Sequence, residues 1–315
     1  MTMRIYSSFD SVEKDCYGGA VALGTFDGLH IGHRTIIDGA ISSGTRPVGV
    51  LTFANHPLSV IAPDMEPLYL VSRSVRRELL AEIGIDFLVE LEFTAELAAM
   101  PPELFVERMI LALHPTAVTV GENYSFGAYG KGTSEMLGRL ARQMSEQLTG
   151  VPCRVDTFPL TRTEDGIAVS STRIRKAVQA GDVARAAVLL GRPFSMEGMV
   201  IHGDEQGRTI GFPTANIMPD ERQAVPNNGA YAVYASVDDE GRRIPAIAAV
   251  TNKPTAGGRE RRLEVHLLDF AGDIYGSQLR VSFIEKLRDE RRFASFQELK
   301  EQLEKDKQQA NEILK

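Results

Sequence analysis

A strand–turn–helix pattern near the N-terminus constrains the fold of this 315-residue chain more than any other feature. An apolar run at residues 20–23 indicates a buried strand, and apolar residues follow at helical spacing at Ile36, Ile37 and Ala40. Glycines and an aspartate fill the turn between them, where tight backbone geometry is needed. The first N–H groups of the helix have no partners within the helix and point into this turn, so the pattern predicts an anion site.

Two histidines, His30 and His33, stand at the mouth of this predicted helix. Because they are three residues apart, they can face the same phosphate, donate hydrogen bonds to it and become protonated as negative charge develops. The alternative is an ordinary glycine-rich turn with two surface histidines. We favour the phosphate site. Its other contacts are expected from four residues of the turn, Gly24, Phe26, Asp27 and Gly28.

The complete string Gly-x-Phe-Asp-Gly-x-His-x-Gly-His, at residues 24–33, resembles the signature of a nucleotidyltransferase superfamily. Members of that superfamily transfer adenylyl or cytidylyl groups from a nucleoside triphosphate. The resemblance implies that His30 and His33 are catalytic residues, which steady the α-phosphate during its transfer.

The remainder of the first half alternates strand-like runs with helical segments. The expected strands are residues 48–53, 87–91, 116–120 and 153–158, and the expected helices are residues 72–83, 102–113 and 134–148. This alternation predicts a doubly wound, Rossmann-like parallel sheet. Ligands of such sheets bind at the carboxyl ends of the strands, where the sequence places His56-Pro57 and the polar segment 121–127.

Hydroxyl side chains followed by arginines occupy residues 169–175. Ser170, Ser171 and Thr172 can cap the helix that runs to about residue 180. Arg173 then falls in the first helical turn, where a cation is unfavourable unless an anion lies nearby. An ordinary capped helix with solvated arginines is the alternative. Since this segment follows a phosphate-type turn and a full α/β sheet, we interpret it as a clamp on a triphosphate, with Arg173 neutralising the departing pyrophosphate.

Beyond residue 193 the pattern changes to short β-type runs. These runs, at residues 195–201, 229–237, 243–250, 263–270 and 279–287, predict an antiparallel sheet or small barrel. One charged helix, residues 295–313, ends the chain, and its Lys- and Glu-rich face is expected in solvent. We place the boundary between the two predicted domains after residue 186, which gives a first domain of residues 1–186 and a second of residues 187–315.

A glycine-rich loop joins the first two of these runs. Its glycines let the backbone approach a phosphate closely. Thr214 and Asn216 follow at the expected start of a strand, where alternate side chains point the same way, as oxygen ligands of Mg²⁺ would. An ordinary surface loop with a polar strand edge is the alternative. The predicted phosphate contacts of the loop are Gly203, Gly207, Arg208 and Gly211.

The string Gly-Arg-x-x-Gly-Phe-Pro-Thr-Ala-Asn in this loop resembles the riboflavin kinase signature. In this order, the two halves resemble the bifunctional prokaryotic riboflavin kinase/FMN adenylyltransferase family over nearly the whole chain. The resemblance implies an N-terminal Rossmann-like nucleotidyltransferase domain and a small C-terminal antiparallel β-barrel kinase domain with a terminal helix. It also implies two reactions: riboflavin and ATP give FMN and ADP, and then FMN and ATP give FAD and pyrophosphate.

The same resemblance implies roles for three further residues. Glu264 would activate the 5′-hydroxyl of the ribityl chain, and a carboxylate is a suitable base for an alcohol that attacks a phosphoryl group. Asn123 and Arg288 would contact the flavin. The alternative for Glu264 is a surface residue at a strand edge. Oxygen ligands and ATP together favour Mg²⁺ as the divalent ion.

Two segments depart from the family pattern. Residues 54–57 read Ala-Asn-His-Pro, where an acidic residue and a proline usually precede His-Pro. Residues 250–256 read Val-Thr-Asn-Lys-Pro-Thr-Ala in place of Ile-Gly-x-x-Pro-Thr-Phe, which can reshape the flavin end of the kinase site. Two alternatives therefore stay open: a transferase whose kinase half is inactive or weak and only binds flavin, and a flavin-responsive regulatory protein without turnover. The intact His30, His33 and Arg173 argue against the second.

Composition narrows the class of protein. A net charge of −7 argues against general binding of nucleic acid or anionic membranes, so small molecules are the expected partners. Cys16 and Cys153 are too few for a disulfide framework or a zinc site, which indicates free thiols in a reducing cytoplasm. No apolar run reaches membrane-spanning length, and the N-terminus lacks a signal-peptide core. We expect a cytoplasmic monomer or weak homo-oligomer.

Overall fold

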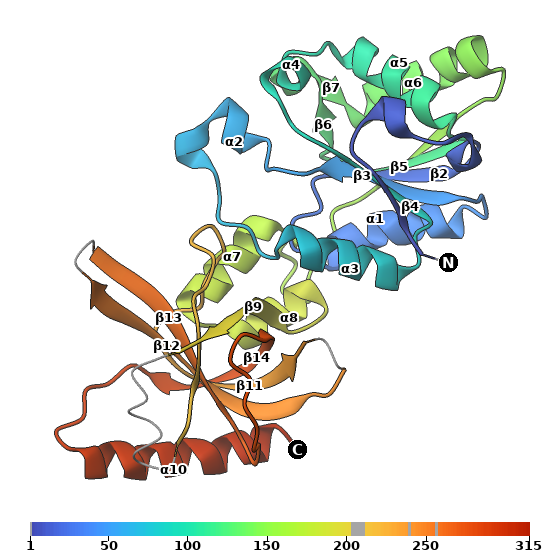
Figure 1. Ribbon diagram of the computed structural model, residues 1–315. Helices are drawn as coiled ribbons and strands as arrows, with labels where there is room; N and C mark the ends of the chain where they lie inside the picture. Colours follow the sequence, from blue (N-terminus) through green and yellow to red (C-terminus); the bar gives the residue numbers. More distant parts are fainter. Residues whose placement is uncertain (1, 203–211, 239–240, 256–257) are drawn as a thin grey trace. The chain divides into compact units, whose positions relative to one another are not determined.

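The computed structural model describes residues 2–202, 212–238, 241–255 and 258–315 (Figure 1). Packing divides this chain into two units. The first unit contains the residues up to Pro67 together with Ser72–Ser170, and the second contains Leu68–Val71 together with Ser171–Lys315. Residues 171–186, which the sequence analysis assigned to the first domain, therefore pack with the second unit. Packing does not show which residues serve which activity, so the boundary at 186/187 between the two activities stays a prediction.

A six-stranded sheet of order β1-β4-β3-β2-β5-β8 forms the centre of the first unit. Its strands are β1 (Arg4–Tyr6), β2 (Ala20–Leu23), β3 (Val48–Phe53), β4 (Phe87–Leu91), β5 (Ala117–Gly121) and β8 (Arg154–Phe158). Every neighbouring pair runs parallel. The predicted Rossmann-like sheet is therefore confirmed, and β1 is an additional edge strand that the sequence analysis did not include.

Helices cover both faces of this sheet (Figure 1). Ala20 and Ala22 of β2 pack with α1 and α3, whereas Val21 and Leu23 pack with α5 and α6, because alternate residues of a strand point to opposite faces. The bounds are α1 (Ile31–Ser42), α3 (Arg73–Ile83), α5 (Pro102–Leu113) and α6 (Ser134–Thr149). Smaller elements are α2 (Leu58–Ile61), α4 (Ala95–Ala98) and the hairpin of β6 (Ser125–Phe126) and β7 (Gly132–Thr133).

A buried carboxylate attaches α3 to this sheet. Glu90 of β4 is buried and accepts hydrogen bonds of 2.6 Å from each of Arg73, Arg76 and Arg77. The spacing i, i+3, i+4 places these arginines on one face of the helix. Burial by itself raises the pKa of the Glu90 carboxyl, but the hydrogen bonds from Arg76, Arg73 and Arg77 outweigh it and hold this pKa below its ordinary value.

A closed antiparallel barrel of order β10-β13-β12-β11-β14-β9 forms the second unit. Its strands are β9 (Phe194–Ile201), β10 (Ala215–Ile217), β11 (Gly229–Val237), β12 (Ile244–Thr255), β13 (Gly258–Leu267) and β14 (Gln278–Asp289). Two helices, α7 (Ser171–Ala180) and α8 (Val183–Leu190), precede it, and α10 (Phe296–Ile313) follows along its outer surface (Figure 1). The predicted small barrel with a terminal helix is confirmed. No helix among the described residues combines the length and apolarity that crossing a membrane requires.

Four residues of the first half, Leu68–Val71, pack in this second unit. The main-chain N–H of Tyr69 donates to the carbonyl of Arg222 at 2.8 Å, and the N–H of Ala224 donates to the carbonyl of Tyr69 at 2.9 Å. Leu70 is fully buried. The chain therefore passes between the units at 67/68, 71/72 and 170/171.

A second buried carboxylate, Asp306, attaches α10 to the barrel. Arg288 of β14 donates from Nε to Oδ2 of Asp306 at 3.0 Å, and its Nη2 lies 2.9 Å from the same oxygen. Gln302 donates to Oδ1 of Asp306 at 2.8 Å. The Lys- and Glu-rich face of this helix is expected in solvent, and Glu301, Glu304 and Lys305 are exposed. Asp306 instead shares the buried face with Ala310 and is only 2% exposed, with its charge compensated by Arg288.

Asp306→Asn leaves the largely buried guanidinium of Arg288 without its counter-ion. We expect the free energy of unfolding to fall by about 3 kcal/mol, because breaking a buried ion pair leaves an uncompensated charge. Urea unfolding of the two proteins measures the difference. Asp269→Asn is the matched control, since Asp269 meets Lys307 of the same helix in solvent, at 3.6 Å. Equal destabilisation by both variants would contradict the anchoring role of Asp306.

Glu90 makes the first unit sensitive to acid. A carboxylate whose pKa is lower in the folded state stabilises the fold above its unfolded pKa, about 4.3, and this stability is lost as the pH falls through the folded value. We expect Glu90→Gln to lose about 3 kcal/mol at pH 7 and to show a smaller further loss on acidification than the parent protein. Urea unfolding at pH 7 and pH 4 tests this. Glu92→Gln, at an exposed position two residues away, should keep the parent's pH dependence.

Candidate functional site

The strand order of the first unit reverses beside β2. From β2 the chain moves outward to β3 and β4, and it then crosses to β5 and β8 on the other side. In open α/β sheets ligands bind outside the carboxyl ends of the strands at such a point. The turn beginning at Gly24 follows β2, and the loop with Asn123 follows β5. The structure therefore brings these two predicted segments to one edge of the sheet.

The turn after β2 has an uncommon backbone. Phe26 and Leu29 adopt left-handed φ angles of 49° and 43°, beside Gly28 at 80°. The fully buried ring of Phe26 packs against Gly24, where a Cβ would lie 2.9 Å from the ring, so that only glycine fits. Because its ring is buried, Phe26 could contact a ligand only through its main chain. The predicted phosphate contacts of Gly24, Phe26, Asp27 and Gly28 stay predictions.

The two histidines form a stacked pair at the start of α1. Nδ1 of His30 accepts a hydrogen bond from the main-chain N–H of His33 at 3.2 Å, which caps the helix. The ring centroids lie 3.6 Å apart, with an angle of 16° between the planes. Because Nδ1 of His30 acts as the acceptor, the neutral ring carries its proton on Nε2, the nitrogen that can donate to an anion.

Two further segments reach α1. A Cβ at Gly121 would lie 3.2 Å from Oδ1 of Asn123 and 3.4 Å from Cδ1 of Ile36, so this loop packs closely against the helix. The exposed amide of Asn123 is therefore close to α1. Thr161, in the connection after β8, shares a 3.2 Å hydrogen bond with Thr35.

Helix α7 carries the predicted triphosphate clamp. It begins at Ser171, which places Ser170 directly before the helix, and Thr172 and Arg173 in its first turn. Packing groups α7 with the second unit and Ser170 with the first. An approach of Arg173 to the histidine pair stays a prediction.

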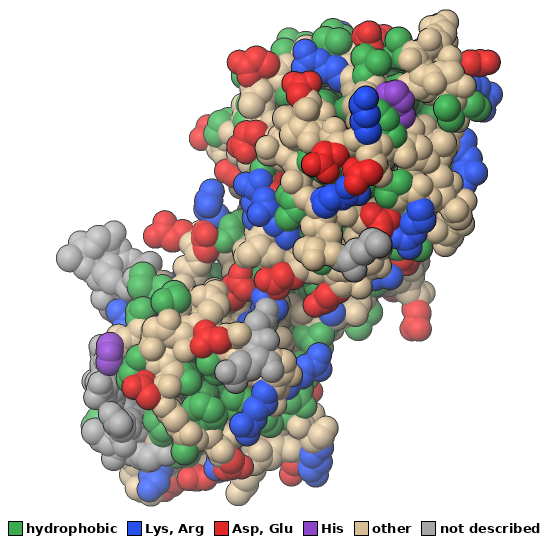
Figure 2. All heavy atoms as spheres, turned by 45° about the vertical axis from the view of Figure 1, so that its right-hand side comes forward, with side chains coloured by type: hydrophobic (Ala, Val, Ile, Leu, Met, Phe, Trp, Pro, Cys, Tyr) green, Lys and Arg blue, Asp and Glu red, His purple; other side chains and the backbone are tan. Residues whose placement is uncertain are grey.

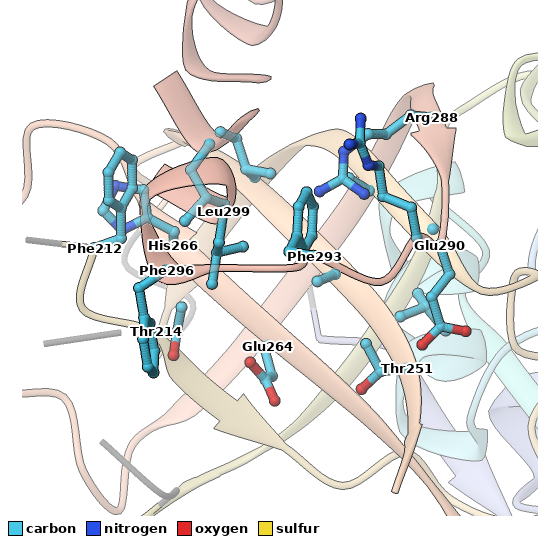
Figure 3. A pocket seen from close by; sticks show the side chains of 17 residues that line it. Phe212, Thr214, Thr251, Glu264, His266, Arg288, Glu290, Phe293, Phe296 and Leu299 are labelled. Carbon is cyan, nitrogen blue, oxygen red and sulfur yellow. The ribbon is translucent and has the colours of Figure 1, made fainter. Parts of the chain in front are cut away.

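A cavity of about 270 Å³ lies between the outer surface of the barrel and the start of α10 (Figure 3). One wall is apolar and consists of Phe293, Phe296, Leu299 and Leu303. The floor consists of alternate residues of two strands, Ile247, Ala249 and Thr251 of β12 and Glu264 and His266 of β13. An apolar wall above a floor with a few polar groups suits an aromatic ligand that bears hydroxyl groups.

The predicted kinase residues lie in and directly beside this cavity. Antiparallel pairing of β10 with β13 sets Asn216 directly opposite Glu264, and such pairs have Cβ atoms about 4.5–5.5 Å apart on the same face. Thr214 lines this cavity together with Glu264 (Figure 3). With Asn216, Thr214 also lines a neighbouring cavity of about 570 Å³. The structure thus brings these three residues together, whereas Gly203, Gly207, Arg208 and Gly211 lie outside the described residues.

His266, a residue outside the predicted site, also borders the cavity. Its Nδ1 lies 2.8 Å from the carbonyl oxygen of Pro213, and its ring packs against Phe212 at 5.0 Å between centroids. Burial lowers the pKa of this imidazole. His266 therefore fixes the loop that leads directly into Thr214. The available sequence signal was its position two residues after Glu264, on the same face of one strand.

Arg288 lines the cavity (Figure 3), but it is also bound to α10 through Asp306. Its guanidinium carbon lies 5.6 Å from the ring centre of Phe293, so it packs along an aromatic wall residue. Arg288 thus has a clear structural task, and its contact with flavin stays a prediction.

Thr251 belongs to the segment that departs from the family pattern. It lies on the cavity floor, two residues along β12 from Ala249, the residue opposite Glu264. Its hydroxyl oxygen is buried and, among the described residues, has no hydrogen-bond partner. A buried hydroxyl without a partner is unfavourable, so a ligand that bonded to it would relieve this cost.

Comparisons with known proteins cover both units. The FAD synthetase family model matches residues 12–173, and the riboflavin kinase family model matches residues 190–314. The bifunctional riboflavin kinase/FMN adenylyltransferase of Escherichia coli (strain K12) is 37% identical over 94% of this chain and 93% of its own. That of Bacillus subtilis (strain 168) is 34% identical over 98% and 96%. A crystal structure described as a macrolide-efflux protein from Streptococcus pneumoniae is 30% identical, covers 99% of each chain and has a TM-score of 0.88.

These matches agree with the two sites described above. The FAD synthetase match contains the stacked histidines, and the riboflavin kinase match contains the cavity with Glu264. With relatives 34% and 37% identical over 98% and 94% of its length, the chain belongs to the bifunctional riboflavin kinase/FMN adenylyltransferase family.

Proposed function

We propose that this chain makes FAD from riboflavin in two ATP-dependent steps. The barrel unit phosphorylates riboflavin to FMN, and the parallel-sheet unit adenylylates FMN to FAD with release of pyrophosphate. The observation that carries the proposal is that each unit keeps its reactive groups together: His30 stacks on His33 at the switch point of the sheet, and Glu264 faces Asn216 at the barrel cavity.

In the transferase step, a phosphate oxygen of FMN attacks the α-phosphorus of ATP. The new P–O bond forms as the bond from the α-phosphorus to its bridging oxygen breaks, and pyrophosphate leaves. Nε2–H of His30, His33 and the first N–H groups of α1 stabilise the charge on the transferring phosphate. Arg173 neutralises the pyrophosphate, with Ser170, Ser171 and Thr172 beside it.

In the kinase step, Glu264 accepts the proton of the 5′-hydroxyl of riboflavin. The hydroxyl oxygen attacks the γ-phosphorus of ATP, and ADP leaves. Thr214 and Asn216 offer a hydroxyl and an amide oxygen, which fit Mg²⁺ together with phosphate oxygens. When bound, Mg²⁺ neutralises the developing phosphate charge. The described residues contain no group of three or more His, Cys, Asp or Glu side chains suited to a metal ion, so these neutral oxygens are the candidate ligands.

The remaining predictions concern location and partners. Besides its small-molecule substrates, we propose no nucleic-acid or membrane partner. On the face shown in Figure 2, basic and acidic side chains are interspersed rather than gathered into one basic field, which supports this proposal. A cytoplasmic location and a monomeric or weakly associated state stay part of the proposal, as does the domain boundary at 186/187.

The first test is to incubate the purified protein with ATP, Mg²⁺ and either riboflavin or FMN, and to separate the flavins over time. We expect FAD from both starting points, with transient FMN from riboflavin. His30→Ala combined with His33→Ala should lower FAD formation from FMN at least about 100-fold and leave FMN formation from riboflavin intact. Glu264→Gln should lower FMN formation from riboflavin and leave FAD formation from FMN intact. The activity that each variant retains thus shows that the variant is folded.

Matched controls accompany these variants. His114→Asn replaces a histidine elsewhere in the first unit, and Glu285→Gln replaces an exposed strand glutamate of the barrel. Both should retain the two activities. FAD from FMN alone would favour the alternative in which the kinase half binds flavin without turnover. Unchanged FAD formation by the double histidine variant would overturn the proposed transferase site.

Thr251 allows a separate prediction about the kinase cavity. Thr251→Val removes the buried hydroxyl but keeps the shape of the side chain. We expect the free protein to gain about 1 kcal/mol of stability, while the KM for riboflavin rises about fivefold, because the hydroxyl bonds to the substrate only when it is bound. Thr251→Ser, which retains a hydroxyl, should keep the KM near the parent value. If the valine variant binds riboflavin as tightly as the parent, the hydroxyl makes no such bond.

A further inference from the structure

We propose that Arg76 is a positioning residue for adenylyl transfer, which fixes the histidine-bearing turn through its main-chain carbonyls. Arg76 lies on α3 and donates from Nη2 to the carbonyl oxygen of Phe53 at 2.6 Å. Its Nη1 lies 3.4 Å from the carbonyl oxygen of Thr25. Since Thr25 follows β2 and Phe53 ends β3, one guanidinium joins the carboxyl ends of two neighbouring strands. The inference rests on the proposed transferase function.

The carbonyl of Thr25 has a second donor. The hydroxyl of Thr52, a buried residue of β3, donates to the same oxygen at 3.0 Å. Arg76 and Thr52 therefore hold the peptide group that immediately precedes Phe26. This matters because Phe26 and Leu29 have left-handed backbones without being glycines. Such conformations persist only where the surroundings hold them in place.

Arg76 is itself held rigidly. The same Nη2 that bonds to Phe53 lies 2.6 Å from Oε1 of Glu90, and the side chain of Arg76 is 11% exposed. Arg73 and Arg77 bond to the other carboxylate oxygen, Oε2, and are more exposed. In the described part of the chain, these two arginines donate to no carbonyl of the turn. The cluster thus contains one arginine that reaches the turn and two that do not.

The chemistry of the group also favours a geometric role. A planar guanidinium can bond to Glu90 and to both carbonyls at once, whereas the single ammonium of a lysine cannot reproduce this fork. An apolar cluster would hold α3 on the sheet equally well, since replacing buried ion pairs by apolar residues is often neutral or stabilising. What an apolar cluster cannot do is fix the direction of the Thr25 carbonyl, and with it the position of the His30 ring beyond the turn.

The matched pair of variants is Arg76→Lys and Arg77→Lys. Both keep the charge and weaken the bonds to Glu90, but only the first removes the contacts with the turn. We expect Arg76→Lys to lower kcat for FMN adenylylation about tenfold or more with little change in the KM for ATP, because small misplacements of catalytic groups have large effects on rate. Riboflavin phosphorylation by the same protein should stay unchanged. Arg77→Lys should leave both activities within twofold of the parent.

A second variant removes the hydrogen bond that the sheet donates to the carbonyl of Thr25. Thr52→Val keeps the side-chain shape, retains Glu90 and its three arginines, and removes the other donor to the carbonyl of Thr25. It should also lower kcat for adenylylation and spare the kinase. If Arg76→Lys and Arg77→Lys lower adenylylation equally, or if Thr52→Val has no effect, Arg76 acts only as a structural anchor and the proposal fails.

An imidazole NMR measurement separates this inference from the proposed function. The ring nitrogen signals of His30 and His33 should shift in Arg76→Lys and not in Arg77→Lys, whether or not the protein forms FAD. If the parent protein forms no FAD but the signals still shift in Arg76→Lys, the proposed function is refuted and the positioning role is retained. Unshifted signals in Arg76→Lys would refute the positioning role, even where FAD is formed.

Discussion

The site of the first unit depends on the parallel pairing of β2 with both β3 and β5. Because β2 is the strand beside which the order reverses, the chain leaves its carboxyl end toward one face of the sheet and leaves β5 toward the other. The turn at Gly24 and the loop at Gly121 are therefore neighbours, although almost 100 residues separate them. The stacked histidines and the amide of Asn123 reach the same helix, α1, for this topological reason.

The barrel brings its groups together by a different principle. No strand order reverses there, and the register of β10 against β13 alone decides that Asn216 faces Glu264. A shift of one residue would turn one of these side chains to the other face of the sheet. The register is well determined, because Ala215 and Ile217 must point inward while Asn216 points outward. Apolar packing inside the barrel thus sets the polar arrangement on its outside.

Local patterns explain what the sequence could predict. Apolar runs of strand length identified most strands of the sheet and the barrel, and the glycine and histidine spacing identified the turn. Edge strand β1 was missed because its three residues, Arg4–Tyr6, carry no apolar alternation and gain their order only from β4. Likewise, no local signal shows that residues 68–71 pack with residues 222–224, because that pairing depends on contacts distant in the sequence.

Glu90 marks the limit of sequence reasoning most clearly. A glutamate within the apolar run Phe87–Leu91 is a visible anomaly, and arginines spaced i, i+3, i+4 on a neighbouring helix are a visible pattern. Their connection is not visible, because it requires the crossing of α3 over β4. Asp306 and Arg288 repeat this arrangement at the barrel, where a buried carboxylate joins α10 to β14 beside the cavity.

Both anchors lie where a helix borders a site, and this location has a physical reason. Apolar contacts are non-directional and let a helix settle in several closely similar positions. A guanidinium–carboxylate pair adds a fixed direction and distance. It therefore fixes both the rotation of the helix about its own axis and its distance from the strand. The arrangement costs desolvation energy, which apolar residues would avoid. Such a cost is tolerable where the position of a neighbouring turn or wall decides whether a ligand fits, and both helices occupy such places.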